Sequence, residues 1–278
     1  MISATVLESK LVVRSLRRNS QTTYAVCLAL VLLASAVCVA RAPPSTPSSR
    51  HLHTLSRSPS SLSLSLSLSL SLSLSKGHLG YETTDHLPIN RGFLSHVGYL
   101  GGSEGYEYGG GDANATKGKH DLWHDRAPGI DVVPEMFYSA NYYTKTAVGI
   151  ITKHAAMHTA TSTAKPLFLY LPYQNVHSPN TLPPAWETHT FPKFGNGEVD
   201  LHTYANMLNM LDSGMKNVTA ALKSTGMWAN TLLVFSADNG GIGKFGNNHP
   251  LRGHKHDPWE GGIRATAFIS GGFFFYYI

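Results

Sequence analysis

The spacing of apolar positions predicts two helices in the second half of the chain. Between residues 201 and 222 apolar side chains recur every three or four positions, which is typical of an amphipathic helix, and Gly226 is a suitable end for it. A shorter pattern of the same kind predicts a helix near residues 140–158. The apolar positions of the longer helix are Leu201, Tyr204, Leu208, Leu211, Met215, Val218 and Leu222.

Continuous apolar runs predict strands between and after these helices. Residues 167–171 and 231–235 contain no polar alternation, as expected for parallel strands that are buried on both faces. Residues 264–270 are a third candidate strand. Because helices and strands alternate, we expect an α/β fold with a largely parallel sheet sandwiched by helices.

The start of the chain has the layout of a secretory signal peptide, which we assign to residues 1–42. Three arginines, the last of them Arg18, precede an apolar run over residues 25–39, and small residues follow it. The alternative is a membrane anchor, but the run is shorter than the ~20 residues that span a bilayer. We therefore expect contact with a membrane only through this segment, if it stays uncleaved.

Residues 43–75 are predicted to be a disordered, low-complexity segment. Residues 43–60 are rich in Pro and Ser, and Ser61 to Ser75 alternate Ser and Leu without a break. The alternation mimics a strand of period two, but a translated CT-dinucleotide repeat has the same sequence, and we hypothesise that origin. Residues 76–278 then make up the folded domain.

Charge and cysteine content narrow the classes of function. Charged residues make up only 14% of the chain, and the formal net charge is +5. Residues 1–75 hold seven basic and one acidic residue, whereas the remainder holds fifteen basic and sixteen acidic ones, so we expect no nucleic-acid partner. Cys27 and Cys38 are the only cysteines, which excludes a disulfide scaffold, a zinc finger and a cysteine nucleophile in the folded domain.

Two polar clusters follow the predicted strands. Residues 174–179, which include His177, follow the first strand, and residues 236–241 follow the second. The carboxyl ends of parallel strands meet at one edge of a sheet, where ligands bind in such folds. Asp238 and Asn239 carry the hard oxygens that Ca²⁺ or Mg²⁺ prefers. The alternatives are a plain turn for Asp238 and Asn239, and a loop histidine bonded to backbone for His177.

Basic residues near these clusters suit an anionic ester. Lys76 and His78 follow the Ser-Leu repeat, and Lys255 follows the second cluster. A metal with lysines neutralises charge on a transferred tetrahedral group, and a histidine protonates the departing oxygen. The alternative for each lysine alone is a solvated surface charge.

Together these features resemble the sulfatase family, and in particular its arylsulfatase B-like branch. Residues 76–81 are similar to the family's Gly-Lys-Trp-His-Leu-Gly segment, with Gly77 in place of the tryptophan. The other matching segments follow in the expected order: 87–93, 98–104, 165–179, 217–241, 250–252 and 259–264.

The resemblance implies a role for each matching residue. Asp238 and Asn239 are expected to be Ca²⁺ ligands, and Lys76 and Lys255 to hold sulfate oxygens. His78 is expected to assist the hydrated aldehyde nucleophile, and His177 to contact sulfate and assist the leaving oxygen. The implied fold is the α/β fold that sulfatases share with alkaline phosphatase, here incomplete.

The implied reaction is hydrolysis of a sulfate ester on a sulfated glycan or a small molecule, with N-acetylgalactosamine 4-sulfate as the suggested unit. An alternative is a pseudoenzyme that binds sulfated glycans without cleaving them. A third interpretation is a metal-dependent phosphoesterase of the same broad fold, although the Lys and His set and residues 259–262 favour sulfate.

Two departures from the family pattern predict that the chain as written has no turnover. The family needs an Asp-Asp pair before the segment of Lys76, and the sequence has none there. It also needs a Cys-x-Pro-x-Arg motif whose cysteine becomes formylglycine. Neither Cys27 nor Cys38 is followed by Pro-x-Arg, so no nucleophile is assigned.

Other features indicate the secretory pathway, with a lysosomal or extracellular destination. Asn114 and Asn217 begin Asn-x-Thr triplets that fit the glycosylation sequon. Residues 101–111, rich in Gly, Tyr and Glu, are predicted to be a flexible surface linker, with a loop that shapes substrate access as the alternative.

Overall fold

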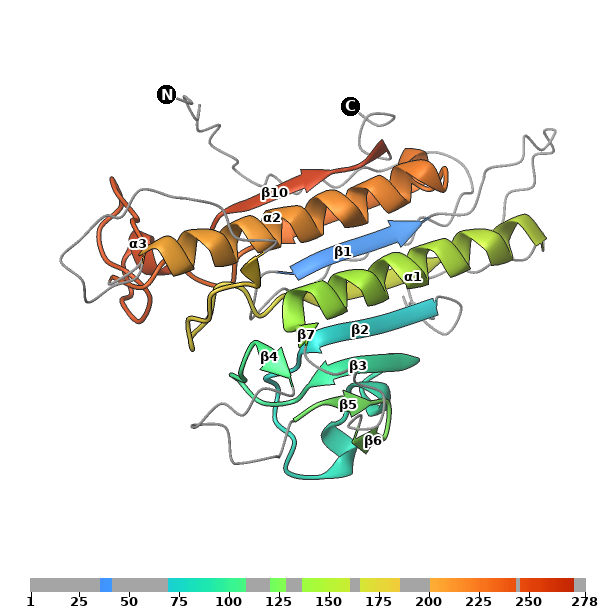
Figure 1. Ribbon diagram of the computed structural model, residues 1–278, viewed down its shortest axis with the longest axis horizontal. Coiled ribbons are helices and arrows are strands. Elements are labelled where there is room, and N and C mark those ends of the chain that lie inside the picture. The colour runs from blue at the N-terminus through green and yellow to red at the C-terminus, as the bar shows by residue number, and fades with distance from the viewer. Residues whose placement is uncertain are drawn as a thin grey trace, which may run out of the picture.

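The computed structural model describes residues 36–41, 70–108, 121–128, 137–160, 166–185, 201–243 and 246–272 (Figure 1). Its strands are β1 (Ala36–Arg41), β2 (Leu70–Lys76), β3 (Ser95–Tyr99), β4 (Glu107–Tyr108), β5 (Trp123–His124), β6 (Ala127–Pro128), β7 (Phe137–Tyr138), β8 (Leu167–Pro172), β9 (Thr231–Ser236) and β10 (Ala267–Ser270). Its α-helices are α1 (Ser139–Ala160), α2 (Leu201–Ser224) and α3 (Glu260–Ile263), and short 3₁₀ turns lie at Thr84–His86, Pro88–Asn90 and Trp228–Asn230.

Eight strands form one mixed sheet in the order β10-β9-β1-β8-β2-β3-β5-β6. Strand β2 pairs in parallel with both β3 and β8. Strand β1 is antiparallel to both of its neighbours, β8 and β9, so these two strands run in the same direction as β2. The carboxyl ends of β2, β8 and β9 therefore lie at one edge of the sheet. The predicted α/β fold is confirmed.

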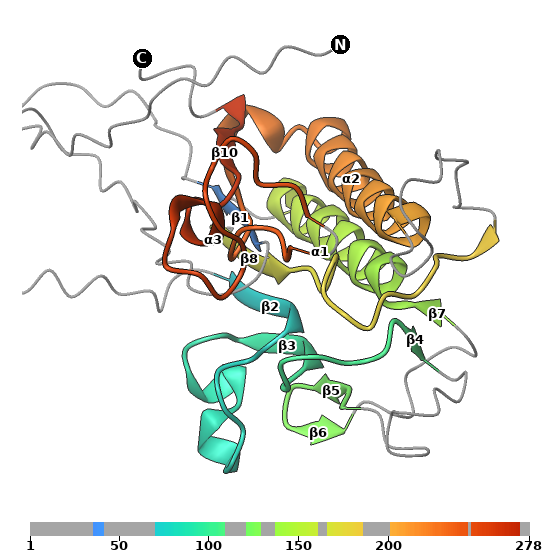
Figure 2. The ribbon, with the colours of Figure 1, turned by 90° about the vertical axis from the view of Figure 1, so that its left-hand side faces the viewer.

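Both long helices cover the same face of this sheet, as Figure 2 shows. Leu167, Leu169 and Leu171 of β8 point to that face and are fully buried in the core. On the opposite face, the ring of Phe93 stacks on Phe168 and Tyr170, with centroid distances of 6.2 and 6.1 Å. The side chain of Phe93, from the loop before β3, therefore covers part of this second face.

Helix α2 has the predicted length, but the face that it buries is rotated from the predicted stripe. Its buried positions are Thr203, Asn206, Met207, Met210, Leu211, Gly214, Val218, Ala221 and Leu222. Leu208, at the centre of the predicted stripe, is 51% exposed. The rotation arises because the inner face includes a small residue and a polar residue whose side chain is hydrogen-bonded. A Cβ at Gly214 would crowd Tyr173, and the Asn206 amide donates to the carbonyl oxygen of His202 at 2.9 Å.

The disorder predicted for residues 43–75 does not hold for residues 70–75, which belong to β2. The alternating pattern is the physical reason, because in a strand it directs leucines and serines to opposite faces. Leu74 is buried in the core, whereas Ser71 donates a hydrogen bond from Oγ to the carbonyl oxygen of Gly92 at 2.9 Å. The folded part thus begins before Lys76, and residues 43–69 lie outside the described ranges.

Strand β1 comes from the segment predicted to be a signal peptide. Its backbone is in register with β8 from Ala36 to Ala40 and with β9 from Ala36 to Arg41. It therefore occupies an interior position, the third of the eight strands. The signal-peptide assignment itself stays a prediction. Among the described residues there is no helix with the length and apolar character that crossing a bilayer requires.

Candidate active site

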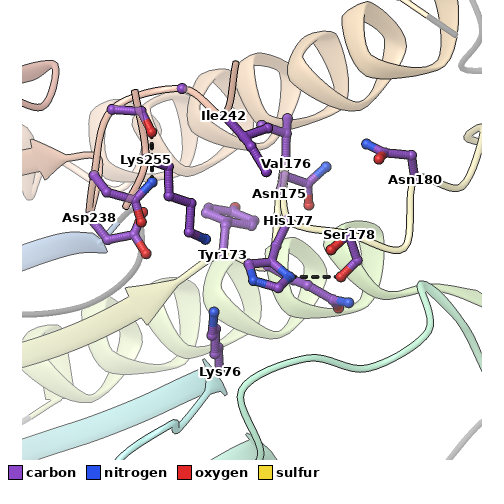
Figure 3. Close-up of a pocket in the computed structure, with 14 residues that line it drawn as sticks. Lys76, Tyr173, Asn175, Val176, His177, Ser178, Asn180, Asp238, Ile242 and Lys255 are labelled. Atoms are coloured by element: carbon purple, nitrogen blue, oxygen red, sulfur yellow. Dashed lines mark hydrogen bonds between the residues drawn. The ribbon is translucent and has the colours of Figure 1, made fainter. Parts of the chain in front are cut away.

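A pocket of about 210 Å³ opens at the sheet edge where β2, β8 and β9 end (Figure 3). Lys76 is the last residue of β2, His177 lies in the turn after β8, and Asp238 follows β9. In Figure 3 the side chains of Lys76, His177 and Lys255 point toward a common space. Asn239 also lines the pocket. Five of the predicted site residues, which are 179 positions apart at the extremes, therefore meet in one place.

Lys76 is buried at the floor of this pocket. It is only 4% exposed, and the parallel ladder continues past it because the Gly77 amide donates to the carbonyl oxygen of Tyr99 at 2.7 Å. Burial lowers the pKa of Lys76, the Asp238 carboxylate opposes this shift, and the Lys255 ammonium adds to it. A buried ammonium of this kind is short of counter-charge, so an incoming anion stabilises it.

The ring of His177 is oriented by its own loop. The distance from its Nδ1 to the carbonyl oxygen of Ser178 is 2.7 Å. A carbonyl oxygen can only accept, so Nδ1 carries the proton and the Nε2 lone pair remains for the pocket. Burial is the main cause that lowers the pKa of His177. The carbonyl of Ser178 opposes this shift, the ammonium groups of Lys76 and Lys255 reinforce it, and the carboxylate of Asp238 opposes it.

Lys255 and Asp238 are held together by a compact loop that Asn248 organises. The Asn248 side chain accepts from the Gly241 amide at 2.9 Å and donates to the Gly241 carbonyl oxygen at 2.8 Å. The Lys255 amide donates to the same carbonyl oxygen at 3.1 Å. Nearby, a Cβ at Gly240 would clash with the carbonyl oxygen of Gly261, so only glycine allows this approach.

His78 lies beside this pocket and does not line it. Its side chain is exposed, and its backbone adopts a positive φ of 50°. The ring lies so close to Gly102 that a Cβ there would clash with it. Burial is the main cause that lowers the pKa of His78, and the Lys76 ammonium adds to the effect. The structure therefore places His78 in the electrostatic field of the pocket lysines without direct contact.

The described residues supply only part of a calcium site. Asp238 and Asn239 offer one carboxylate and one amide oxygen at the pocket wall. Calcium takes about 6–8 oxygen ligands. Within the described ranges no group of three or more His, Cys, Asp or Glu residues is placed to hold a metal ion. The described part of the chain therefore does not complete a calcium site, and we assign no chemical step to the ion.

One residue that shapes the pocket carries no recognisable sequence signal. Tyr173 is nearly fully buried and lines the pocket, yet neither spacing nor charge marks it in the sequence. Gln174 and Asn175 are also buried and line the pocket, and they belong to the predicted polar cluster of residues 174–179. The proposed glycan acceptor Asn217 is exposed on α2, as a modification site requires. Asn114, the other predicted acceptor, lies outside the described residues.

Comparisons with known proteins agree on one family. The sequence profile described as Sulfatase matches residues 74–272. The chain is 37% identical to arylsulfatase J of Mus musculus over 196 residues, which cover 70% of this chain and 31% of that protein. It is 29% identical over 144 residues to an N-acetylgalactosamine-6-O-sulfatase of Bacteroides thetaiotaomicron (strain ATCC 29148), covering 47% of this chain and 26% of that protein.

A solved structure supports the same relationship. The crystal structure of Ps i-CgsB in complex with k-i-k-neocarrahexaose superposes with a TM-score of 0.62 at 28% identity, over 74% of this chain and 46% of that chain. The chain spans less than a third of the length of the two curated relatives described above. The profile match covers well over half of the chain, and the proteins of this family are sulfuric ester hydrolases. The chain therefore belongs to the sulfatase family.

Proposed function

We propose that the pocket binds the sulfate group of a sulfated sugar or a small sulfate ester. The observation that carries this proposal is the convergence of Lys76, Lys255 and His177 on one space from three separate segments. Two ammonium groups exceed the single carboxylate of Asp238, which leaves the pocket with a positive charge. Such a site favours a tetrahedral anion, as charge-assisted hydrogen bonds are about twice as strong as neutral ones.

Each side chain has a distinct part in this proposal. Lys76 and Lys255 contact the outer sulfate oxygens and neutralise their charge. When protonated, His177 donates from Nε2 to the oxygen that links sulfate to the sugar, the place of a leaving-group acid. His78 acts from the rim, where it supports the reacting group without touching the sulfate in the present arrangement.

The proposed activity of the whole protein is sulfate ester hydrolysis, but we propose that this chain binds without turnover. The sulfatase family generally uses Ca²⁺ and formylglycine. Neither cysteine of the chain lies in a Cys-x-Pro-x-Arg motif. The only cysteine within the described residues, Cys38, pairs in register with Tyr170 and Val234 inside the sheet. A sulfated-glycan-binding protein is therefore the second candidate function.

For the substrate we propose a sulfated amino sugar of the N-acetylgalactosamine 4-sulfate type. Two of the similar proteins support a carbohydrate ligand: one is named an N-acetylgalactosamine-6-O-sulfatase, and another was crystallised with k-i-k-neocarrahexaose. We further propose a place in the secretory pathway, lysosomal or extracellular, with Asn217 as a glycan acceptor. Its exposure on α2 supports that modification.

The test uses the full chain and calorimetric titration with N-acetylgalactosamine 4-sulfate. Replacing either pocket lysine, in Lys76→Met or Lys255→Met, is expected to weaken binding about 10–100-fold, because each removes a charge-assisted contact. Lys145→Met is the matched control, since Lys145 is exposed on α1 away from the pocket, and it should bind like the parent chain.

Parallel assays with 4-nitrophenyl sulfate and 4-nitrophenyl phosphate separate the remaining alternatives. Binding of the sulfate ester without release of nitrophenol supports the binding function of this chain. Release of nitrophenol from the sulfate ester overturns the proposed lack of turnover, and preference for the phosphate ester supports a phosphoesterase. Equal affinities of the parent chain, Lys76→Met and Lys255→Met contradict the proposed site.

A further inference from the structure

The turn that presents His177 is held by the side chain of Tyr106. Within the turn, the His177 amide donates to the carbonyl oxygen of Gln174 at 2.9 Å. The Tyr106 hydroxyl lies 2.9 Å from the carbonyl oxygen of Gln174 and 2.9 Å from that of His177. One phenol proton is thus shared between the first and last carbonyl groups of the turn.

The surroundings of Tyr106 keep its hydroxyl group protonated. Its side chain is 0% exposed, and its ring stacks on Tyr138 with centroids 5.2 Å apart. Burial raises the pKa of Tyr106 well above its ordinary value, so the hydroxyl remains a donor throughout the physiological range. Removing the hydroxyl takes a donor from both carbonyl oxygens of the turn, and the loss of a buried hydrogen bond is costly.

Other contacts tie the same two segments together. The Ser103 hydroxyl donates to the carbonyl oxygen of Ser178 at 2.8 Å, and the Gln174 side-chain amide donates to the carbonyl oxygen of Glu104. On the other side of the loop, the Tyr138 hydroxyl donates to the carbonyl oxygen of Thr181 at 3.2 Å. The prediction of a flexible linker over residues 101–111 is thus wrong for residues 101–108, because this segment is hydrogen-bonded to the loop that carries His177.

We propose that Tyr106 is a positioning residue for His177. By fixing both ends of the turn, its hydroxyl sets the direction of the imidazole and keeps that ring partly desolvated beside the two lysines. Tyr106 itself does not line the pocket and acts only through His177. The effect on sulfate affinity rests on the proposed function, whereas the effect on the His177 imidazole does not.

The experiment compares Tyr106→Phe with Tyr99→Phe in the full chain. Both variants lose one phenol oxygen from a fully buried ring, but the Tyr99 hydroxyl has no hydrogen-bond partner among the described residues. Tyr106→Phe is expected to move the His177 pKa, followed by NMR of its imidazole, upward toward its ordinary value, because a looser turn hydrates the ring. Tyr99→Phe should leave the His177 titration unchanged.

Sulfate titrations of the same proteins, with inorganic sulfate as the probe, complete a double-mutant cycle. At a pH low enough to protonate His177 in both proteins, the imidazolium of Tyr106→Phe is no longer held in the direction of the anion. Tyr106→Phe is then expected to weaken sulfate binding about ten-fold in the parent chain and to have no effect in a His177→Gln background. Ser103→Ala removes an exposed hydrogen bond to the carbonyl oxygen of Ser178 in the same loop. This variant should weaken sulfate binding in the same direction, but less.

The outcomes separate this inference from the proposed function. If the parent chain does not bind sulfate but Tyr106→Phe still shifts the His177 titration, the proposed function fails and the positioning role stands. If Tyr106→Phe matches Tyr99→Phe in the His177 titration, the positioning role is overturned. An equal loss of sulfate affinity with and without His177 also overturns it, since Tyr106 then acts through the fold in general.

Discussion

Among the residues that line the pocket, His177 is the one whose charge changes most readily as the pH falls below neutrality. Its pKa in the free protein lies below its ordinary value of about 6.5, because burial and the two nearby ammonium groups disfavour the imidazolium. A bound sulfate adds negative charge and raises that pKa. Binding therefore takes up a proton, and we expect sulfate affinity to increase as the pH falls through the pKa values of His177.

This pH dependence is measured by sulfate titrations of the full chain between about pH 4 and pH 8. His177→Gln should bind more weakly at low pH and lose the rise in affinity. His124→Gln, a change at an exposed histidine of β5, should keep the rise. The same rise in His177→Gln would assign the pH dependence to another group.

The residues of the pocket differ in how well their sequence signals identify them. His177 and Asp238 follow predicted strands, so sequence reasoning could place them at one sheet edge. Lys76 lies in a family-like segment, so only its chemistry and the resemblance linked it to them. Tyr106 and Asn248 could not be found in this way, because each acts by bonding backbone groups of a loop. Such contacts depend on where loops cross in space, and no fixed spacing in the sequence encodes them.

Strand β1 is an interior strand of the sheet, although it comes from the predicted signal peptide. It pairs with β9 along its whole length and with β8 from Ala36 to Ala40. Cleavage after residue 42 would remove it and leave the facing backbone groups of both neighbours without partners. We expect a chain that begins at residue 43 to lose several kcal/mol of unfolding free energy, at about 1 kcal/mol per lost hydrogen bond.

Urea denaturation of two truncated chains measures this effect. The matched control begins at residue 25 and lacks only the basic start of the chain, so it should be as stable as the full chain. A chain beginning at residue 43 that unfolds at the same urea concentration as the control would show that β1 contributes nothing. In that case the segment is free to act solely as a leader.

The elements themselves show what hydrophobic periodicity determines. The bounds of α1, α2, β8 and β9 agree with the predicted ranges within about two residues at most ends, since long amphipathic helices and apolar runs are strong signals. The buried face of α2 was not predictable, because Gly214 allows a close approach to Thr144 of α1 and to Tyr173 after β8 that an apolar count ignores. Strand β2 was missed because its serines face loops and not solvent.

On the scale of the whole molecule, the pocket depends on the sheet because its residues come from the ends of strands. Any change that loosens the sheet therefore also separates Lys76, His177 and Asp238. His96 is a buried titratable group of this sheet, since it lies in β3 and only 1% of its surface is exposed. Burial lowers its pKa to about 4, while the Asp125 carboxylate and a backbone bond to Ser73 oppose the shift and His124 adds to it.

This buried histidine predicts how the stability of the whole chain responds to acid. In the unfolded chain His96 takes up a proton near its ordinary pKa of about 6.5, whereas in the folded chain it does so only near pH 4. The contribution is fully present above about pH 6.5 and is lost as the pH falls toward 4. It amounts to about 3 kcal/mol, at 1.36 kcal/mol per pKa unit.

Denaturation curves recorded from about pH 7 to pH 4 test this expectation against two variants. His96→Gln, which cannot titrate, should flatten the decline in unfolding free energy over this range, even if it lowers stability at neutral pH. His249→Gln changes an exposed histidine that does not contribute to the His96 pKa shift, so this variant should decline like the parent chain. An unchanged slope in His96→Gln would place the acid sensitivity elsewhere, with His78 and His177 as the next groups because burial lowers both of their pKa values. Since the strands position the pocket, a loss of stability at low pH would also oppose the tighter sulfate binding that protonation of His177 favours.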